Sequence, residues 1–297
     1  MFVKARLSKW AVGCGMAVAL FEACPLLWAA PSLTQIGSGL YCYISDNDGS
    51  ANSTFLVGDK GILVVDTGVD EKEGAKLLQS IRSVSPLPIL YIVNTHYHKD
   101  HQGGNSTVGP GAKVISTDFT RERTLTLAES LSGAGAALQP AQITFQQKVT
   151  LHLDPYVAEI YFPGKAHTSG DALVYFPQQQ AIATGDLFLN RSSPAMDQGS
   201  VSNWIRALKE VLARPIKAAV PGHFELGTKQ DLQRFHDYLS DLYTQVQLLH
   251  KKQVSLDRVP LQLRLEQYSD FRQYPQYEAT FSDNAKSIYK ELQQAHK

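Results

Sequence analysis

The amino-acid sequence predicts an α/β fold, and two observations carry this prediction. Short apolar runs that are typical of buried strands alternate with segments in which apolar residues recur every three or four positions, as on one face of a helix. Four of the predicted strands lead into a histidine or an aspartate, and open α/β sheets place functional groups at the carboxyl ends of their strands. With 297 residues, of which 43% are hydrophobic, the chain is long enough for one large core or two small ones.

The first thirty residues differ from the rest. Three basic residues lie within the first nine positions and precede an apolar run, Trp10–Phe21, that is too short to span a membrane comfortably. This pattern predicts a signal peptide over residues 1–30, cleaved after Ala29 or Ala30, and therefore a periplasmic or secreted protein without stable membrane insertion after cleavage. An uncleaved amphipathic leader and a lipid-modified Cys24 are the alternatives.

Charge and cysteine content restrict the partners and the redox chemistry. The formal net charge is zero and no basic stripe stands out, so we expect no nucleic-acid partner. Cleavage of the leader would leave Cys42 as the single cysteine, which excludes an internal disulfide. Cys42 lies in an apolar strand pattern, Leu40–Ile44, which favours a buried, inert thiol over a reactive one. The sequence does not specify an oligomeric state.

The first predicted elements are a hairpin and a β-α-β unit. We expect strands over Tyr41–Ile44, Phe55–Val57, Ile62–Val65 and Leu90–Val93. The polar segment Ser45–Ser50 is suited to the hairpin link. Asp70 and Glu73 form a plausible capping box for a helix between the third and fourth strands, which Pro86 stops. The fourth strand leads to His96, at the carboxyl edge of the predicted sheet.

The second half of the chain continues the alternation. We expect strands over Glu159–Phe162, Ala172–Phe176, Ala181–Ala183 and Ala218–Val220. An amphipathic helix is predicted between Val201 and Leu212, and Thr228 can cap a long last helix. The tail after Pro260 is expected to be helical and to pack on the outside. No linker separates two halves, so we expect a single domain over residues 33–297, with a helical C-terminal extension from about residue 228 to 297.

The residues that point to chemistry are histidines and aspartates. His96–His101 places three imidazoles and one carboxylate within six positions, and these are ligand types that zinc and iron accept. Four other histidines, His152, His236, His250 and His296, are expected to be solvated. The candidate metal ligands are His96, His98, Asp100, His101, His167, Asp186 and His223. This set of five imidazoles and two carboxylates meets the requirement of a two-metal site once one or two waters are added.

The motifs around these residues resemble those of the metallo-β-lactamase superfamily. The signature His-x-His-x-Asp-His is matched by His96–His101, His-Thr-x-Gly-Asp by His167–Asp171, Gly-Asp by Gly185-Asp186, Pro-Gly-His by Pro221–His223, and the upstream Asp-Thr-Gly by Asp66–Gly68. The resemblance covers about residues 35–226 and is specific for the fold and the metal site, but not for the substrate.

The resemblance implies a four-layer αβ/βα sandwich of two mixed β-sheets flanked by helices. It implies that His96, His98 and His167 hold one Zn²⁺, that Asp100, His101 and His223 hold a second, and that Asp186 bridges both, with iron or manganese as alternative metals. Asp66 would form hydrogen bonds to the loop that presents the ligands.

On this basis we expect an exported dinuclear zinc hydrolase of a small-molecule ester, thioester, lactone or amide. A hydroxide held between the ions would attack a carbonyl carbon, with Asp100 as the catalytic residue that orients it. Many zinc β-lactamases have a Cys at the position of Asp186 and a Lys three positions later, where this chain has Leu189; Arg191 is the candidate to take the place of that Lys. The bridging Asp is more similar to glyoxalase II, lactonases and related esterases.

Three alternative functions stay open. The chain is also compatible with a β-lactamase proper, with an iron-dependent sulfur oxidoreductase similar to persulfide dioxygenases, or with an accessory metal-binding protein of a periplasmic pathway. The segment Ser45–Ser53 either overhangs the site, as a comparable loop does in relatives, or is an ordinary solvated turn.

Overall fold

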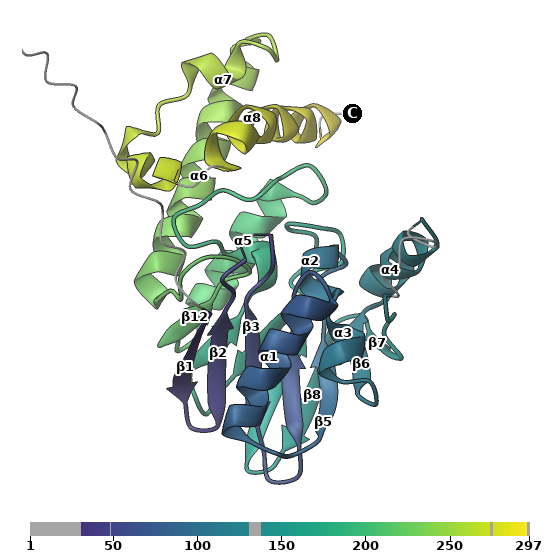
Figure 1. The fold of residues 1–297 in the computed structure, drawn as a ribbon. Helices are drawn as coiled ribbons and strands as arrows, with labels where there is room; N and C mark the ends of the chain where they lie inside the picture. Colours follow the sequence, from purple (N-terminus) through teal and green to yellow (C-terminus); the bar gives the residue numbers. More distant parts are fainter. Residues whose placement is uncertain (1–30, 48, 131–137, 274–275, 296–297) are drawn as a thin grey trace, which may run out of the picture.

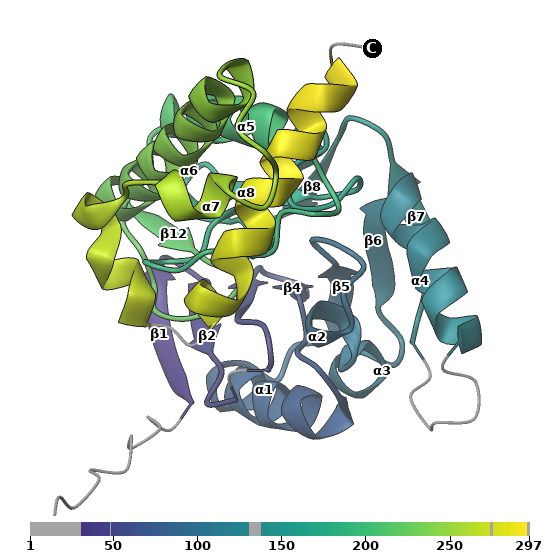
Figure 2. The same ribbon diagram turned by 90° about the horizontal axis from the view of Figure 1, so that it is seen from above.

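Two β-sheets stacked face to face form the centre of the molecule, and helices cover the outer face of each sheet (Figure 1, Figure 2). The computed structural model describes residues 31–47, 49–130, 138–273 and 276–295. The predicted signal peptide, residues 1–30, therefore lies outside the described residues. The arrangement is the four-layer αβ/βα sandwich of two mixed sheets that the sequence resemblance implies.

The first sheet has seven strands that follow one another in sequence order. They are β1 (Ser32–Gly37), β2 (Leu40–Ile44), β3 (Ser53–Val57), β4 (Ile62–Val65), β5 (Ile89–Val93), β6 (Lys113–Thr117) and β7 (Ile143–Phe145). The pairs from β1 to β4 are antiparallel, and those from β4 to β7 are parallel. The carboxyl ends of β4 and β5 consequently meet at the same edge, as the predicted β-α-β unit requires.

The second sheet has five strands in the spatial order β12-β11-β10-β9-β8. Their bounds are β8 (Lys148–Leu153), β9 (Tyr156–Tyr161), β10 (Leu173–Phe176), β11 (Ala181–Ala183) and β12 (Ala218–Val220). Only the β11–β12 pair is parallel among the pairs of this sheet. The segments that follow β11 and β12 therefore leave from one edge, which faces the corresponding edge of the first sheet.

The helices fill the connections and the C-terminal third. They are α1 (Glu71–Val84), α2 (Lys99–Gln102), α3 (Asn105–Val108), α4 (Asp118–Ser130), η1 (Gly185–Leu187), α5 (Val201–Leu212), α6 (Lys229–Lys251), α7 (Val259–Gln262), η2 (Glu266–Gln273) and α8 (Gln276–Ala295). Asp70 caps α1 by accepting a hydrogen bond of 2.8 Å from the Glu73 amide. The Glu73 carboxylate does not complete the predicted capping box, because it accepts hydrogen bonds from the Tyr43 and Ser45 hydroxyls instead. It thereby ties α1 to the β2–β3 hairpin.

Apolar residues form three clusters that follow the layers. One lies between the two sheets and includes Leu63 and Val93 from the first sheet and Ile160 and Val174 from the second. Another joins α1 to the outer face of the first sheet. Cys42 is fully buried, and this burial raises the pKa of its thiol to about 12, which confirms the prediction of an inert cysteine.

The third cluster joins the second sheet to α5, α6 and α8. The tail is helical, as predicted, and it packs on the outer side of α6 with an apolar face buried. Ala285 and Ile288 on α8 are completely buried, and α8 packs against α6 (Figure 1). Within the described residues, no helix combines the length and apolar composition that a membrane span requires.

Candidate metal centre

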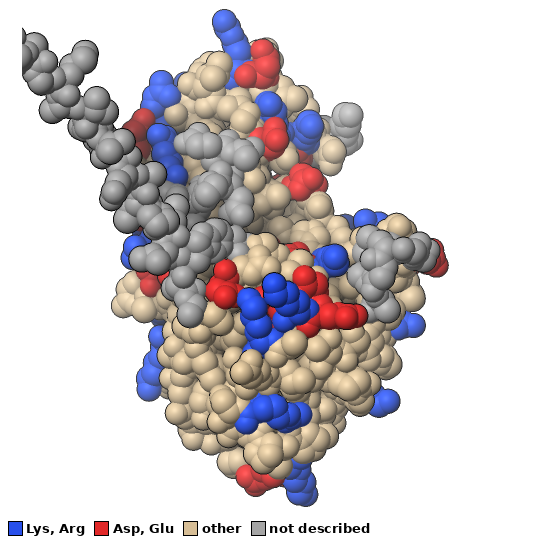
Figure 3. Space-filling view, in the orientation of Figure 1, with Lys and Arg blue, Asp and Glu red and all other residues tan. Residues whose placement is uncertain are grey.

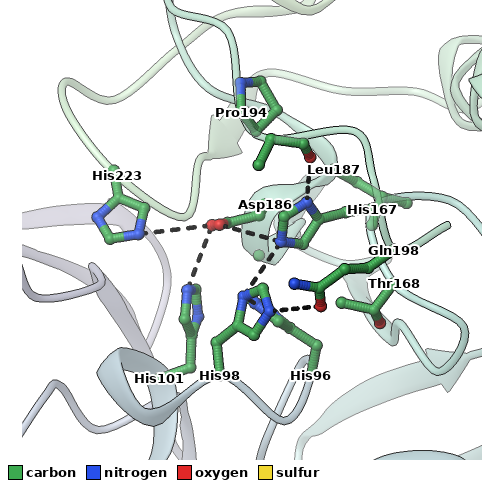
Figure 4. A network of polar contacts seen from close by, with 12 residues as sticks. His96, His98, His101, His167, Thr168, Asp186, Leu187, Pro194, Gln198 and His223 are labelled. Atoms are coloured by element: carbon green, nitrogen blue, oxygen red, sulfur yellow. Dashed lines mark hydrogen bonds and ion pairs between the residues drawn. The ribbon is translucent and has the colours of Figure 1, made fainter. Parts of the chain in front are cut away.

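The seven candidate ligands form two neighbouring groups of side chains, and Figure 4 shows all of them except Asp100 with labels. His96 and His98 follow β5, and Asp100 and His101 lie on the short helix α2. The remaining three come from the second sheet: His167 from the loop after β9, Asp186 from η1 after β11, and His223 from the turn after β12. Segments more than 120 positions apart in the sequence thus meet at one site because the strands that precede them end at the same edge.

The first group of ligand atoms comprises His96, His98, His167 and Asp186. His98 Nδ1 lies 2.9 Å from His96 Nε2 and 3.3 Å from His167 Nε2. His167 Nε2 lies 3.5 Å from Asp186 Oδ2. These four atoms are within 4.8 Å of one another, so one ion can contact all of them.

The second group comprises Asp100, His101 and His223. Asp100 Oδ2 lies 3.1 Å from His223 Nε2 and 3.5 Å from His101 Nε2. The other oxygen of Asp186, Oδ1, lies 3.3 Å from His101 Nε2 and 3.6 Å from His223 Nε2. Asp186 therefore directs one carboxylate oxygen toward each group, which is the geometry that a bridging ligand needs.

Two buried polar atoms at the centre of the cluster support a metal site. His101 Nε2 and Asp186 Oδ1 are buried and lie 3.3 Å from each other, without a hydrogen bond of good geometry to any described residue. Leaving such atoms unsatisfied in a folded protein costs about 1–3 kcal/mol each. A cation between them would satisfy both, and the imidazole and carboxylate donors suit zinc, iron or manganese. The residues present thus fit a divalent metal centre.

The electrostatics differ between the two groups. Burial and the neighbouring imidazoles hold the pKa of His96 well below its usual value, and burial lowers the pKa of His167 to about 4. These two rings are consequently neutral at pH 7, as metal ligands must be. Burial also opposes protonation of His101, but the Asp186, Asp100 and Asp66 carboxylates outweigh it and raise the pKa of His101. A metal ion that binds to the second group would therefore displace the proton that His101 otherwise carries.

Asp66 fixes the segment that carries the first ligands. Its Oδ1 accepts a hydrogen bond of 2.8 Å from the Thr95 amide, and its Oδ2 accepts from the Thr95 hydroxyl and lies 2.8 Å from His101 Nδ1. The Thr95 hydroxyl in turn lies 3.1 Å from His96 Nδ1. These contacts leave the Nε2 atoms of both rings free for a metal, and they are the hydrogen bonds that the resemblance implies for Asp66.

The loop between η1 and α5 orients the other two rings of the first group. His98 Nε2 lies 3.0 Å from Gln198 Oε1, and His167 Nδ1 lies 3.1 Å from the carbonyl oxygen of Ala195. Sequence reasoning missed both residues. Ala195 acts through its backbone, which carries no side-chain signal, and a single Gln in a polar loop has no distinguishing pattern.

A cavity of about 310 Å³ opens above the cluster. Five candidate ligands form its floor, and its walls are largely apolar. It is lined by Gly49, His98, Asp100, His167, Asp186, Leu189, Ser193, Pro194, Ala195, His223, Phe224 and Thr280. The segment after β2 therefore does border the site, through Gly49, and Thr280 comes from the tail that was expected to lie outside. Arg191 is not among the lining residues.

Gly222 offers a test of the position of Asp186. A Cβ atom at this residue would lie 1.9 Å from Asp186 Oδ1 and 2.9 Å from the Gly185 backbone, so Gly222→Ala must displace the carboxylate. We expect the variant to bind metal about 10–100-fold more weakly, as seen when the support of a ligand is lost. Titration of the metal-free protein with zinc measures the effect. Gly111→Ala is the control, because its Cβ would meet no atom within 4 Å. Equal zinc affinity in the two variants would contradict the placement of Asp186.

Comparison with known proteins places the chain in a family. The family model described as the metallo-beta-lactamase superfamily matches residues 46–223, more than half of the chain. The metallo-beta-lactamase type 2 of Bacillus cereus is 29% identical over 211 residues, which cover 67% of this chain and 78% of that protein. The 2,4-dinitroanisole O-demethylase subunit alpha of Nocardioides sp. (strain JS1661) is 26% identical over 180 residues, 60% of this chain and 53% of that protein.

Solved structures share the fold at lower identity. A metallo-beta-lactamase from Pontibacter korlensis aligns with a TM-score of 0.60 and 24% identity, covering 71% of this chain and 99% of that chain. The stereoselective inverting sec-alkylsulfatase from Pseudomonas sp. aligns with a TM-score of 0.69 and 16% identity, covering 88% of this chain and 50% of that chain. Fold, site motifs and family match agree: the chain belongs to the metallo-β-lactamase superfamily and is a metal-dependent hydrolase.

Proposed function

We propose that this protein is an exported dinuclear zinc hydrolase that cleaves a small ester, thioester, lactone or amide. The observation that carries the proposal is the position of Asp186, whose two oxygens face two separate groups of ligands. In this proposal His96, His98 and His167 hold one zinc ion, Asp100, His101 and His223 hold the other, and Asp186 bridges them. Bound zinc would supply a water that is acidic enough to act as a nucleophile near pH 7 and a Lewis acid for the substrate oxygen.

Asp100 is the residue proposed to handle the proton. About 29% of its side chain is exposed, against 10% for Asp186, so it is the more accessible carboxylate at the floor of the cavity. Burial opposes ionisation of Asp100, but His101 and His223 outweigh it and hold the pKa of this carboxyl below its usual range. The side chain is thus a carboxylate at pH 7. It can orient the attacking water by accepting its hydrogen bond, and then accept its proton at a carboxylate oxygen.

The cavity walls suggest what lies next to the scissile bond. Leu189, Pro194 and Phe224 contribute apolar surface, and none of the lining residues is a Lys or Arg. A substrate with an apolar group on one side of the reacting carbonyl would bury that group here and gain about 25 cal/mol per Å² of area. A substrate with a second anionic group would find no cationic partner among these lining residues.

Hydrolysis of β-lactams is the second candidate. It is favoured by the curated relatives named metallo-beta-lactamase type 2, of which one is 29% identical over 67% of this chain. Leu189 stands where many zinc β-lactamases have a Lys for the carboxylate of the drug, and its side chain lines the cavity. We therefore expect β-lactam turnover to be weaker than that of a neutral ester or lactone.

We also propose that the protein is exported and that its substrate is a small molecule rather than a nucleic acid. Export is supported by the composition of residues 1–30. The face of the molecule in Figure 3 carries basic and acidic side chains interspersed rather than a basic stripe, which argues against nucleic acid as a partner on this face. Fractionation of cells that produce the full chain tests export, and a chain retained in the cytoplasm with residues 1–30 attached would contradict it.

A substrate panel together with metal analysis tests the activity. The zinc-loaded protein is assayed with an acyl-homoserine lactone, an aliphatic thioester, a secondary alkyl sulfate and nitrocefin, and Asp100→Asn serves as the control for each. We expect turnover of the lactone or thioester to exceed that of nitrocefin, and to fall by about 10²-fold or more in the variant. Purification with one iron per chain and oxidation of a persulfide would favour the sulfur oxidoreductase. Zinc binding without turnover of any compound would favour an accessory metal-binding protein.

A further inference from the structure

The loop between η1 and α5 holds two metal-site histidines, yet it has no regular secondary structure between Asn190 and Gly199 in the described chain. Ala195 and Gln198 in this loop contact His167 and His98. Loops of this kind are mobile unless other parts of the molecule fix them. Something must therefore fix this loop if His167 is to keep a constant orientation.

Asn284 on α8 forms hydrogen bonds to the loop on both sides of Ala195. Its side chain is 2% exposed, and its Oδ1 accepts a hydrogen bond of 3.0 Å from the Met196 amide. Its Nδ2 donates to the carbonyl oxygen of Pro194 at 2.9 Å and to the Ser193 hydroxyl at 3.0 Å. The residues before and after Ala195 are thus held by one buried amide, while the Ala195 carbonyl points at His167 Nδ1.

A second side chain of α8 fixes the far end of the same loop. The Glu291 carboxylate accepts hydrogen bonds from the Ser200 hydroxyl at 2.8 Å and from the Val201 amide at 2.9 Å, where α5 begins. The helix is itself anchored in the apolar cluster that covers the second sheet, through Ala285, Ile288 and Leu292. Helix α8 therefore provides a rigid support for the whole loop.

We infer that Asn284 is a positioning residue for the metal centre, acting through Ala195 on His167. The inference rests on the proposed metal site, and it assigns a role to a helix that lies beyond residues 46–223, the span of the family match. Without the amide, the loop loses three hydrogen bonds and the His167 ring loses its fixed acceptor. Loss of a hydrogen-bond partner that orients a metal ligand lowers metal affinity by about 10–100-fold.

The test compares two variants in the full chain. Asn284→Leu keeps the approximate volume of the side chain and removes its polar atoms, whereas Ile81→Ala removes apolar packing from α1, in the separate cluster on the first sheet, and leaves α8 unaltered. Zinc affinity is measured by competition with a chromophoric chelator, and hydrogen exchange of residues 189–200 is measured in the metal-free protein. We expect weaker zinc binding by about 10–100-fold and faster exchange only in Asn284→Leu, even where Ile81→Ala unfolds at a lower temperature.

Two results would overturn the proposed role of Asn284. Unchanged zinc affinity in Asn284→Leu, or an equal loss in both variants, would overturn the role of Asn284 while leaving the metal site in place. If the unaltered chain binds no zinc, the proposed function and the inference both fail. Should Asn284→Leu not fold, Asn284→Ser takes its place, because a serine adds no bulk or charge and is too short to reach both sides of Ala195.

Discussion

Asp186→Ala is expected to remove metal and activity together. The carboxylate directs Oδ2 toward His167 and Oδ1 toward His101 and His223, so its loss deprives both groups of a ligand at once. It also removes one of the carboxylates that stabilise the protonated, positively charged form of His101. Metal assistance is worth several kcal/mol in the transition state, so we expect kcat/KM to fall by at least about 10³-fold. Elemental analysis of the purified variant and the substrate panel measure the two effects.

Two controls separate a bridging role from a general effect of charge. Asp186→Asn keeps the shape of the side chain but loses its negative charge, and we expect it to retain less zinc than the unaltered protein and more than Asp186→Ala. Asp59→Ala removes an exposed aspartate in the β3–β4 turn and should change neither property. An Asp186→Ala protein that retains two zinc ions per chain would rule out the bridge.

Removal of metal from the unaltered protein is expected to abolish turnover and to lower the melting temperature. Activity depends on the metal for its nucleophile, and the buried donors His101 and Asp186 would lose the cation that binds between them. A ligand present at 1,000 times its Kd stabilises the folded state by about 4.1 kcal/mol, and this contribution disappears with the metal. Dialysis against a chelator, followed by calorimetry and assay, measures both changes.

Restoration by defined metals completes this experiment. Zinc added to the metal-free protein should recover turnover and melting temperature in parallel, whereas magnesium, which prefers all-oxygen ligands, should recover neither. Recovery with iron alone would replace zinc in the proposed function. Turnover that persists when no metal is detectable would contradict a metal-dependent reaction altogether.

Much of the fold was predictable because the strands nearest the site have strong local signals. Ile62–Val65, Ala181–Ala183 and Ala218–Val220 are continuous apolar runs buried on both faces, and the structure has them with the predicted bounds. Each ends in a polar turn that holds a site residue. Burial on both faces and the abrupt change to polar residues are properties of the local sequence, which is why they could be read from it.

Two of the elements that escaped prediction, β8 and α4, have weak patterns. The strand β8 alternates between exposed and half-buried residues at the edge of the second sheet, and α4 buries only Thr120 and Thr124. Neither presents the apolar face on which sequence reasoning depends. The tail was predicted to be helical, but its contact with the loop at Ala195 arises from the packing of α8 on α6 and has no local signature. Long-range polar contacts of this kind require the structure.

The hydrogen bond between Met196 and Asn284 spans 88 positions in the chain. During synthesis the ribosome must add the whole of α6 and most of the tail before this bond can form, whereas His96, His98 and His167 are translated much earlier. An incomplete chain therefore carries the metal-binding residues without their final support. If Asn284 supports His167 as inferred, the centre reaches its full affinity for metal only after the C-terminal helix has packed against the loop.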